Sequence, residues 1–240
     1  MENRDRFVIA IDGPAASGKS TVAAEVADQL DALLFDTGAI YRALTLVALG
    51  RGVSPDDEAQ LAELIDIVDI SVSSPSVADR RTYDVYIDGE DVTWTIRDPA
   101  VDKAVSRISA HEKVRQGLLE LQRKIGSSGQ VIMPGRDVGT VVMPDADLKI
   151  WLDASIDERA RRRQAELAQR DIVITLDEVR KEMRERDNYD SGRALAPMEP
   201  AQDAVVIDTD GRSIEDIVAQ IVQLATLIPA IADEEGSTAS

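Results

Sequence analysis

The chain has 240 residues, of which 44% are hydrophobic and 30% are charged, a composition typical of a soluble globular protein. Its 45 acidic and 27 basic residues give a net charge of −18, which argues against a nucleic-acid polymer or an anionic membrane surface as a partner. With no cysteine and a single histidine, disulfides, thiolate catalysis, Cys-ligated zinc and a histidine metal cluster are excluded.

The hydrophobic residues are spread along the chain. No apolar run approaches the ~18 residues that a membrane-spanning helix requires. Charged residues at the N-terminus precede only five apolar residues, which does not fit a secretory signal. We therefore expect a cytoplasmic protein.

The first predicted element is a buried strand over residues 7–11, an unbroken apolar run. A glycine-rich loop follows, and then a helix over residues 21–30 with apolar residues spaced four apart on one face. The loop fits Gly-x-x-x-x-Gly-Lys-Ser/Thr, the P-loop pattern that wraps nucleotide phosphates. The residues expected to contact these phosphates are Gly13, Pro14, Ala15, Ala16, Ser17, Gly18, Lys19, Ser20 and Thr21.

The chemistry of the loop explains its residue types. Glycines let successive backbone N–H groups turn inward as an anion-binding nest, and Lys19 reaches the β- and γ-phosphates. The Ser20 hydroxyl is a ligand for Mg²⁺, and the helix directs its positive N-terminal end at the same phosphates. Because strand, loop and helix stand in the required order, a chance match is improbable.

The next elements predict an insertion. A short strand at 33–35 precedes helices at 39–49 and 61–68. Period-two segments at 70–73, 83–87 and 91–94 then alternate with turn residues, including an Asp88-Gly89 hairpin signal. We expect a small antiparallel sheet within an insert at 69–95.

The rest of the chain returns to alternation of strands and helices. Helices are predicted at 99–108 and 111–125, strands at 130–133, 148–152 and 204–207, and capping boxes begin helices after Thr175 and Ser213. The fold class is therefore α/β, with a five-stranded parallel sheet covered on both faces and sites at the carboxyl ends of its strands. We expect one domain over 1–232 and a disordered tail at 233–240.

An arginine-rich stretch lies late in the chain. Ten of the 27 basic residues fall between Arg159 and Arg193, together with eight acidic residues. One interpretation is a pair of solvated helices with ion pairs four residues apart. We favour a mobile lid that closes on phosphates, because the acidic residues under-compensate Arg161, Arg162 and Arg163.

Two loops after predicted strands pair a carboxylate with an arginine, at 36–42 and at 135–137. The planar fork of arginine suits phosphate, and a carboxylate accepts from a base amino group or holds Mg²⁺ through water. Phosphoryl transfer needs aligned phosphates, a metal and positive charge rather than a nucleophilic side chain. The predicted features meet these needs.

Several motifs resemble bacterial cytidylate kinases, a family of P-loop nucleoside monophosphate kinases. They are DTGAIYR at 36–42, GEDVT at 89–93, GRDVGTVV at 135–142 and the residues around 186–197, and the resemblance runs in register over 9–217. It implies transfer of the γ-phosphate of ATP, with Mg²⁺, to CMP or dCMP. It also implies an NMP-binding insert, a helical lid within 155–193 and a monomeric protein.

The resemblance also implies roles for individual residues. The acceptor phosphate is assigned to Arg42 and Arg136. The cytosine is assigned to Thr37, Arg115, Asp137 and Arg193. The sugar is assigned to Ser106, Arg186 and Asp190. Asp36 is expected in the same site, and the residues expected to act in catalysis are Lys19, Arg136, Arg162 and Arg163.

The chain departs from its relatives at two positions. Pro134 stands where they often carry an acidic residue, so a carboxylate role in Mg²⁺ binding must pass to Asp36 or Asp137. Thr37 replaces a frequent serine, which keeps the hydroxyl but adds a methyl group. Structural interpretations stay open: Thr37 could cap the following helix, and Asp137 could pair with Arg136 or cap a turn.

Other functions remain possible at this point. A P-loop kinase for UMP or another small acceptor would use the same phosphate-binding residues. A nucleotide switch is less consistent with the chain, which lacks the guanine-reading Asn-Lys-x-Asp pattern. Cytosine is favoured because its amino donor and ring acceptors complement a carboxylate and a guanidinium, whereas uracil inverts that pattern.

Overall fold

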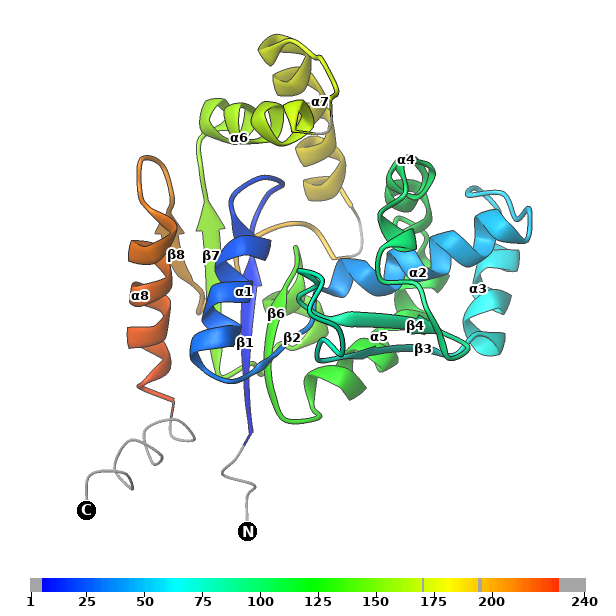
Figure 1. The fold of residues 1–240 in the computed structure, drawn as a ribbon, viewed down its shortest axis with the longest axis horizontal. Helices are drawn as coiled ribbons and strands as arrows, with labels where there is room; N and C mark the ends of the chain where they lie inside the picture. The colour runs from blue at the N-terminus through cyan, green and yellow to red at the C-terminus, as the bar shows by residue number, and fades with distance from the viewer. Residues whose placement is uncertain (1–5, 170, 194–195, 229–240) are drawn as a thin grey trace.

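The computed structural model describes residues 6–169, 171–193 and 196–228 (Figure 1). The tail predicted at 233–240 lies outside the described residues.

Five parallel strands form the main sheet, which confirms the predicted fold class. They are β1 (Phe7–Asp12), β2 (Leu33–Leu34), β6 (Gln130–Pro134), β7 (Leu148–Asp153) and β8 (Val205–Asp208). Their order is β2-β6-β1-β7-β8, and each pair of neighbours is parallel. All six residues of β1 are buried, as its continuous apolar run predicts for a central strand.

The strand order places a switch point at β1. The chain leaves β1 for β2 at one edge and returns through β6, whereas β7 and β8 continue on the other side of β1. In parallel α/β sheets ligands bind at the carboxyl ends beside such a switch. The glycine-rich loop follows β1 at this position.

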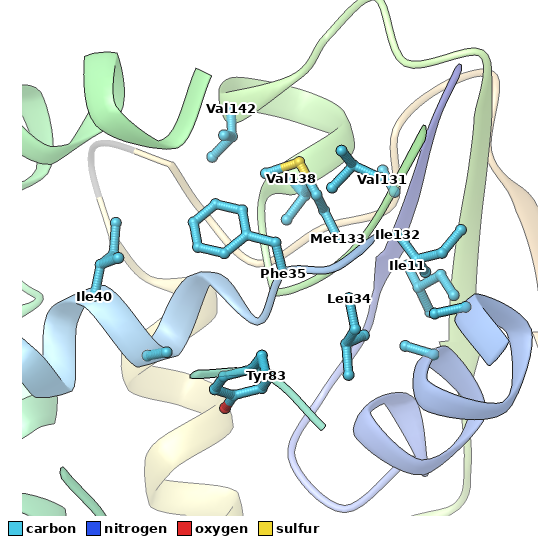
Figure 2. Packing of buried hydrophobic residues seen from close by; sticks show 14 of the residues in the cluster. Ile11, Leu34, Phe35, Ile40, Tyr83, Val131, Ile132, Met133, Val138 and Val142 are labelled. Atoms are coloured by element: carbon cyan, nitrogen blue, oxygen red, sulfur yellow. The ribbon is translucent and has the colours of Figure 1, made fainter. Parts of the chain in front are cut away.

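Helices α1 (Lys19–Gln29), α5 (Glu112–Gly126) and α8 (Ile214–Ala225) lie against the main sheet. Helix α1 packs on β6 and α8, and α5 also contacts β6. Figure 2 shows Phe35, Met133 and Val138 within the hydrophobic core, and all three are fully buried. This core lies next to the loops that follow the carboxyl ends of the strands, so it holds those loops rigidly.

The insertion lies beside the main sheet, at the right of Figure 1. It contains an antiparallel sheet of β3 (Ile70–Ser73), β4 (Asp84–Ile87) and β5 (Glu90–Asp91). Helices α2 (Thr37–Gly50), α3 (Glu58–Ile67) and α4 (Pro99–Ile108) accompany it, with a 3₁₀ turn at Thr95–Arg97.

The hairpin after β4 has the predicted turn. Asp88 and Gly89 have φ angles of 51° and 81°, the left-handed conformations of a two-residue hairpin loop. The third strand is shorter than predicted and ends at Asp91. The Asp91 carboxylate accepts from Thr93 N at 2.9 Å, and the Thr93 hydroxyl accepts from Val85 N. Side-chain hydrogen bonds therefore help to hold the segment after Asp91 against β4.

Two helices stand beyond the carboxyl ends of the main strands, at the top of Figure 1: α6 (Ile156–Ala168) and α7 (Leu176–Ser191). The capping box predicted at Thr175 is present, because its hydroxyl accepts from Glu178 N and Glu178 accepts from Thr175 N. Ala160, Val179 and Met183 form an apolar cluster separate from the main core.

The three arginines predicted to be under-compensated all have partners on α6, but they share two carboxylates. Arg161 and Arg162 both pair with Glu158, and Arg163 pairs with Glu166. These partners lie three or four residues away on the same helix, where side chains are neighbours. Because the single carboxylate of Glu158 faces both Arg161 and Arg162, positive charge remains in excess on this part of the helix, as the sequence predicted.

Candidate active site

The glycine-rich loop joins β1 to α1 and turns tightly against β7. Gly13 has a φ of 150°, and a Cβ there would lie 2.1 Å from the Leu152 carbonyl oxygen. Gly18 is left-handed, with a φ of 96°. The Lys19 ammonium folds over the loop and donates to Pro14 O at 2.5 Å. The glycines therefore permit backbone paths that a side chain would prevent.

The electrostatics of the loop favour an anion. Desolvation, and next the positive charge of Arg136, lower the pKa of Lys19 to about 7, although Asp12 and Asp36 act in the opposite direction. A negatively charged ligand beside the ammonium would restore its charged form.

A cavity of about 380 Å³ opens next to the loop. Among the described residues that line it, seven are cationic and five acidic, a positive excess within a strongly acidic chain. The predicted site residues in this lining are Ala15, Ala16, Lys19, Ser20, Asp36, Thr37, Arg42, Ser106, Arg115, Arg136, Asp137, Arg163, Arg186, Asp190 and Arg193. Residues from six separate segments of the chain therefore meet in one space.

Some predicted residues do not line the cavity. In the P-loop these are Gly13, Pro14, Ser17, Gly18 and Thr21. Arg162 also lies elsewhere: its guanidinium donates to Thr209 O at 2.8 Å and to the Thr209 hydroxyl at 3.0 Å. Thr209 in turn donates to Ser17 O, so Arg162 supports the loop from its outer side in this structure.

Several arginines of the cavity pair with carboxylates. Arg115 pairs with Asp137, and the two come from α5 and the loop after β6. Asp190 pairs with Arg136 and, at 2.5 Å, with Arg193. The Asp137 partner is thus Arg115 rather than the adjacent Arg136, because the loop places the two neighbours in different directions.

Positive charge is concentrated around Arg136. Desolvation, followed by the charges of Arg186 and Arg193, lowers the pKa of Arg136 to about 9. Guanidinium groups crowded in this way repel one another, and a bound polyanion would offset that repulsion.

Thr37 does not cap helix α2. Asp36 is the N-cap, and its carboxylate accepts from Gly38 N at 2.9 Å. The Thr37 hydroxyl instead donates to Pro134 O at 3.3 Å, which links α2 to the end of β6. A Cβ at Gly135 would lie 3.0 Å from this hydroxyl, so the contact depends on the adjacent glycine.

The sequence did not indicate Asp12, the last residue of β1. Its carboxylate is buried and accepts from Val138 N at 2.9 Å and Gly139 N at 2.7 Å. Burial raises its pKa to about 6, although the two N–H donors act against that shift. Asp12 thereby holds the segment that directly follows Arg136 and Asp137, and its only signal in the sequence was a carboxylate ending an apolar strand.

Tyr41 and Arg159 lie within stretches that the sequence singled out, but no contact was predicted for either. Tyr41 lines the cavity, and the Arg115 guanidinium lies 5.8 Å from its ring centroid, within cation–π range. Arg159 is buried, donates to Ala15 O at 3.3 Å and pairs with Asp187 at 2.7 Å. It therefore connects α6, α7 and the P-loop.

A magnesium ion would find oxygen donors here. The Ser20 hydroxyl and the Asp36 carboxylate line the same cavity, and Mg²⁺ prefers such ligands together with nucleotide phosphates. Within the described ranges no group of three or more His, Cys, Asp or Glu residues could hold a metal by itself. The donor set thus fits an ion that arrives with a nucleotide, and Asp137 is less suited because it pairs with Arg115.

The comparison with known families matches this geometry. The cytidylate kinase family model aligns with residues 9–227. The chain belongs to the cytidylate kinase family. A cytidylate kinase of Chloroflexus aggregans is 49% identical to this chain, and the match covers 89% of this chain and 91% of that protein's length. Cytidylate kinases of Herpetosiphon aurantiacus and Pelotomaculum thermopropionicum are each 47% identical over about 90% of this chain and 93% of theirs.

Membership of the cytidylate kinase family confirms the sequence prediction of a nucleotide-binding kinase. Among solved structures, a gluconokinase from Sinorhizobium meliloti 1021 aligns with 97% of this chain and 99% of its own chain. The TM-score is 0.47 and the identity 13%, too distant to support any inference.

No helix in the described part of the chain is long and apolar enough to cross a membrane.

Proposed function

We propose that this chain transfers the γ-phosphate of ATP to CMP or dCMP, giving ADP and CDP or dCDP. The observation that carries the proposal is the single cavity in which Lys19 of the P-loop and the arginines of the acceptor motifs face the same space. A donor site and an acceptor site that share one cavity are what direct transfer between two nucleotides requires.

On the donor side, the P-loop would hold the ATP phosphates through its backbone N–H groups and Lys19. Ser20 and Asp36 would hold Mg²⁺, which neutralises negative charge on the phosphates when it is bound. Arg163 and Arg136 would add positive charge around the transferring group, and Arg162 would join them only if the lid rearranges.

On the acceptor side, Arg42 and Arg136 would bind the CMP phosphate and aim one of its oxygens at the γ-phosphorus. That oxygen forms the new P–O bond while the bond to the β,γ-bridging oxygen breaks, and ADP leaves with the electron pair. The attacking oxygen is already ionised, so no side chain has to remove a proton.

The base and the sugar would be held by the remaining cavity residues. Asp137 would accept from the cytosine amino group, while Arg115, Arg193 and Thr37 would face its acceptors. Ser106, Arg186 and Asp190 would contact the sugar. Binding would exchange the Arg115–Asp137 pair for contacts to the base, which keeps both charged groups satisfied.

We further propose that residues 69–95 act as the NMP-binding insert and residues 155–193 as a lid, within one domain spanning 1–232. As in the family resemblance, the protein would act as a monomer in the cytoplasm.

The proposal is tested by kcat/KM for CMP, dCMP, UMP, AMP and GMP with ATP and Mg²⁺. We expect CMP and dCMP to exceed UMP by about 2–4 kcal/mol of transition-state binding, because uracil leaves buried polar groups unpaired. Asp137→Ala should lower activity with CMP and narrow the CMP/UMP ratio. Equal wild-type use of CMP and UMP would contradict base reading by Asp137, and ATP hydrolysis that no acceptor accelerates would favour a nucleotide switch instead.

A further inference from the structure

Arg42 pairs with the carboxylate of Asp102, a residue to which the proposed function assigns no contact with the substrates. Its Nη1 donates to Asp102 Oδ1 at 2.5 Å and to Ile96 O at 3.3 Å. Arg42 lines the cavity, whereas Asp102 stands behind it in the first turn of α4. About a third of each side chain is exposed, 29% for Arg42 and 33% for Asp102, so the pair lies at the border between the cavity and solvent.

Asp102 acts on a second cavity arginine. Desolvation, and next the charges of Arg163 and Arg42, lower the pKa of Arg186, and the charge of Asp102 opposes this shift. Asp102 therefore faces the positive wall of the cavity from α4. Asp137 and Asp190 are paired with other arginines of that wall, but both have proposed contacts with the nucleotide.

We propose that Asp102 is a placeholder for the acceptor phosphate: it pairs with the Arg42 guanidinium through Nη1 and competes with the CMP phosphate for that group. This inference rests on the proposed function, which assigns the CMP phosphate to Arg42. Asp102 is a positioning residue that touches neither the base nor the reacting atoms.

Competition follows from the geometry of the pair. A phosphate oxygen that approaches Arg42 Nη1 meets the Asp102 carboxylate at hydrogen-bond distance and must displace it. Partly exposed ion pairs are individually weak, so the exchange is readily reversible. After the exchange the charge of Asp102 remains close to the bound phosphate and repels it. Both effects weaken phosphate binding and leave the nucleoside contacts unchanged.

The alternative is that Asp102 orients Arg42 for the phosphate, as carboxylates often do for binding arginines. The two ideas predict opposite signs. If Asp102 competes, its removal strengthens CMP binding; if it orients Arg42, its removal weakens CMP binding.

The test compares the dissociation constants of CMP and of cytidine, which lacks the phosphate, for wild type, Asp102→Asn and Asp102→Ala. We expect CMP to bind about two- to fivefold more tightly to both variants, with cytidine unchanged. Asp56→Asn is the matched control. It removes the same charge and breaks an ion pair with Arg107, which also lies on α4 but away from the cavity. It should change neither constant.

The proposal is overturned if CMP binds equally or more weakly to the Asp102 variants, or if cytidine tightens as much as CMP. Arg42→Ala separates this failure from failure of the proposed function. If Arg42→Ala leaves the ratio of CMP to cytidine affinity unchanged, the acceptor-phosphate site itself is misassigned. If Arg42→Ala lowers that ratio, adding Asp102→Asn to it should give a smaller gain than in wild type, because only the repulsion of the phosphate is then relieved.

Discussion

Lys19 combines two opposing demands at the scale of a single residue. The proposed function assigns its positive charge to the β- and γ-phosphates of ATP, yet its surroundings disfavour that charge and lower its pKa to about 7. Its ammonium donates to Pro14 O at 2.5 Å. The residue that serves phosphate binding is therefore one that the folded chain holds at an energetic disadvantage.

Lys19→Ala should lower kcat by on the order of 10²–10³-fold, the usual effect of removing one positive group from a developing transition state. Its free energy of unfolding should be equal to or above that of wild type, because the variant no longer desolvates an ammonium. Steady-state kinetics and denaturant unfolding measure the two quantities. Lys124→Ala, at an exposed position of α5, is the control for loss of a lysine. A folded Lys19→Ala enzyme with wild-type turnover would show that the loop does not bind the donor.

Asp12 predicts a pH dependence of stability. Its pKa is about 6 in the folded chain and 3.8 in the reference state, so between these values the folded state holds more protons than the unfolded state. The stability that this proton contributes is complete below about pH 4 and is lost as pH rises through about 6, a change on the order of 3 kcal/mol.

Asp12→Asn removes this titration. Relative to wild type, the variant should gain on the order of 3 kcal/mol in the free energy of unfolding between pH 4 and pH 7. Urea unfolding at several pH values measures the difference, with Asp66→Asn on the exposed side of α3 as the matched control. Parallel profiles for wild type and Asp12→Asn would contradict the assignment.

At the scale of elements, α6 and α7 form a unit with its own small core. Ala160, Val179 and Met183 pack together apart from the main cluster. Among the ties to the P-loop side, Arg159 donates to Ala15 O at 3.3 Å and Ala154 O at 3.1 Å. Ala15 and Ala16 of the P-loop also pack against this small core, so the segment could move as a body that keeps its own core while these few contacts change.

We expect residues 69–95 and 155–193 to become more protected from hydrogen exchange when a bisubstrate analogue of ATP and CMP binds. Closure of both segments would exclude water and bring arginines to the transferring group. Peptides from β1, which is buried throughout, provide the internal reference. Unchanged exchange in both segments would argue against a moving insert and lid.

At the scale of the whole molecule, the charge distribution is uneven. The chain carries −18 overall, while cationic residues outnumber acidic ones in the described lining of the cavity. Repulsion across the surface destabilises the compact state, whereas the cavity attracts anionic nucleotides. Salt screens both effects, so its influence on stability and on binding should differ in sign.

Raising KCl from about 0.01 to 0.15 M shortens the Debye length from about 30 to 8 Å. We expect Tm to rise, by about 2–4 °C for each kcal/mol of repulsion relieved, while the KM for CMP increases. Calorimetry and initial rates at constant pH test this. A fall in Tm over this range would show that surface attraction outweighs repulsion.

The sequence by itself determined the elements and the chemistry that lies within short stretches. Apolar periodicity located the five strands, and the P-loop and the 36–42 and 135–142 motifs identified the family before any contact was known. These signals are local, because backbone periodicity and loop conformation depend on neighbouring residues. Those predicted site residues within 15–20, 36–42 and 136–137 that line the cavity do so because they follow strands whose carboxyl ends meet at one edge.

Only the tertiary structure decided which groups pair across the chain. Asp12 binds the backbone of residues 126 and 127 positions away, and Arg42 meets Asp102 60 positions away. Arg162, predicted to act in catalysis, binds Thr209 and does not line the cavity, because α6 places its guanidinium beside the loop that follows β8. Such pairings follow from strand order and helix orientation, and neither is encoded in the spacing of residues along a single segment.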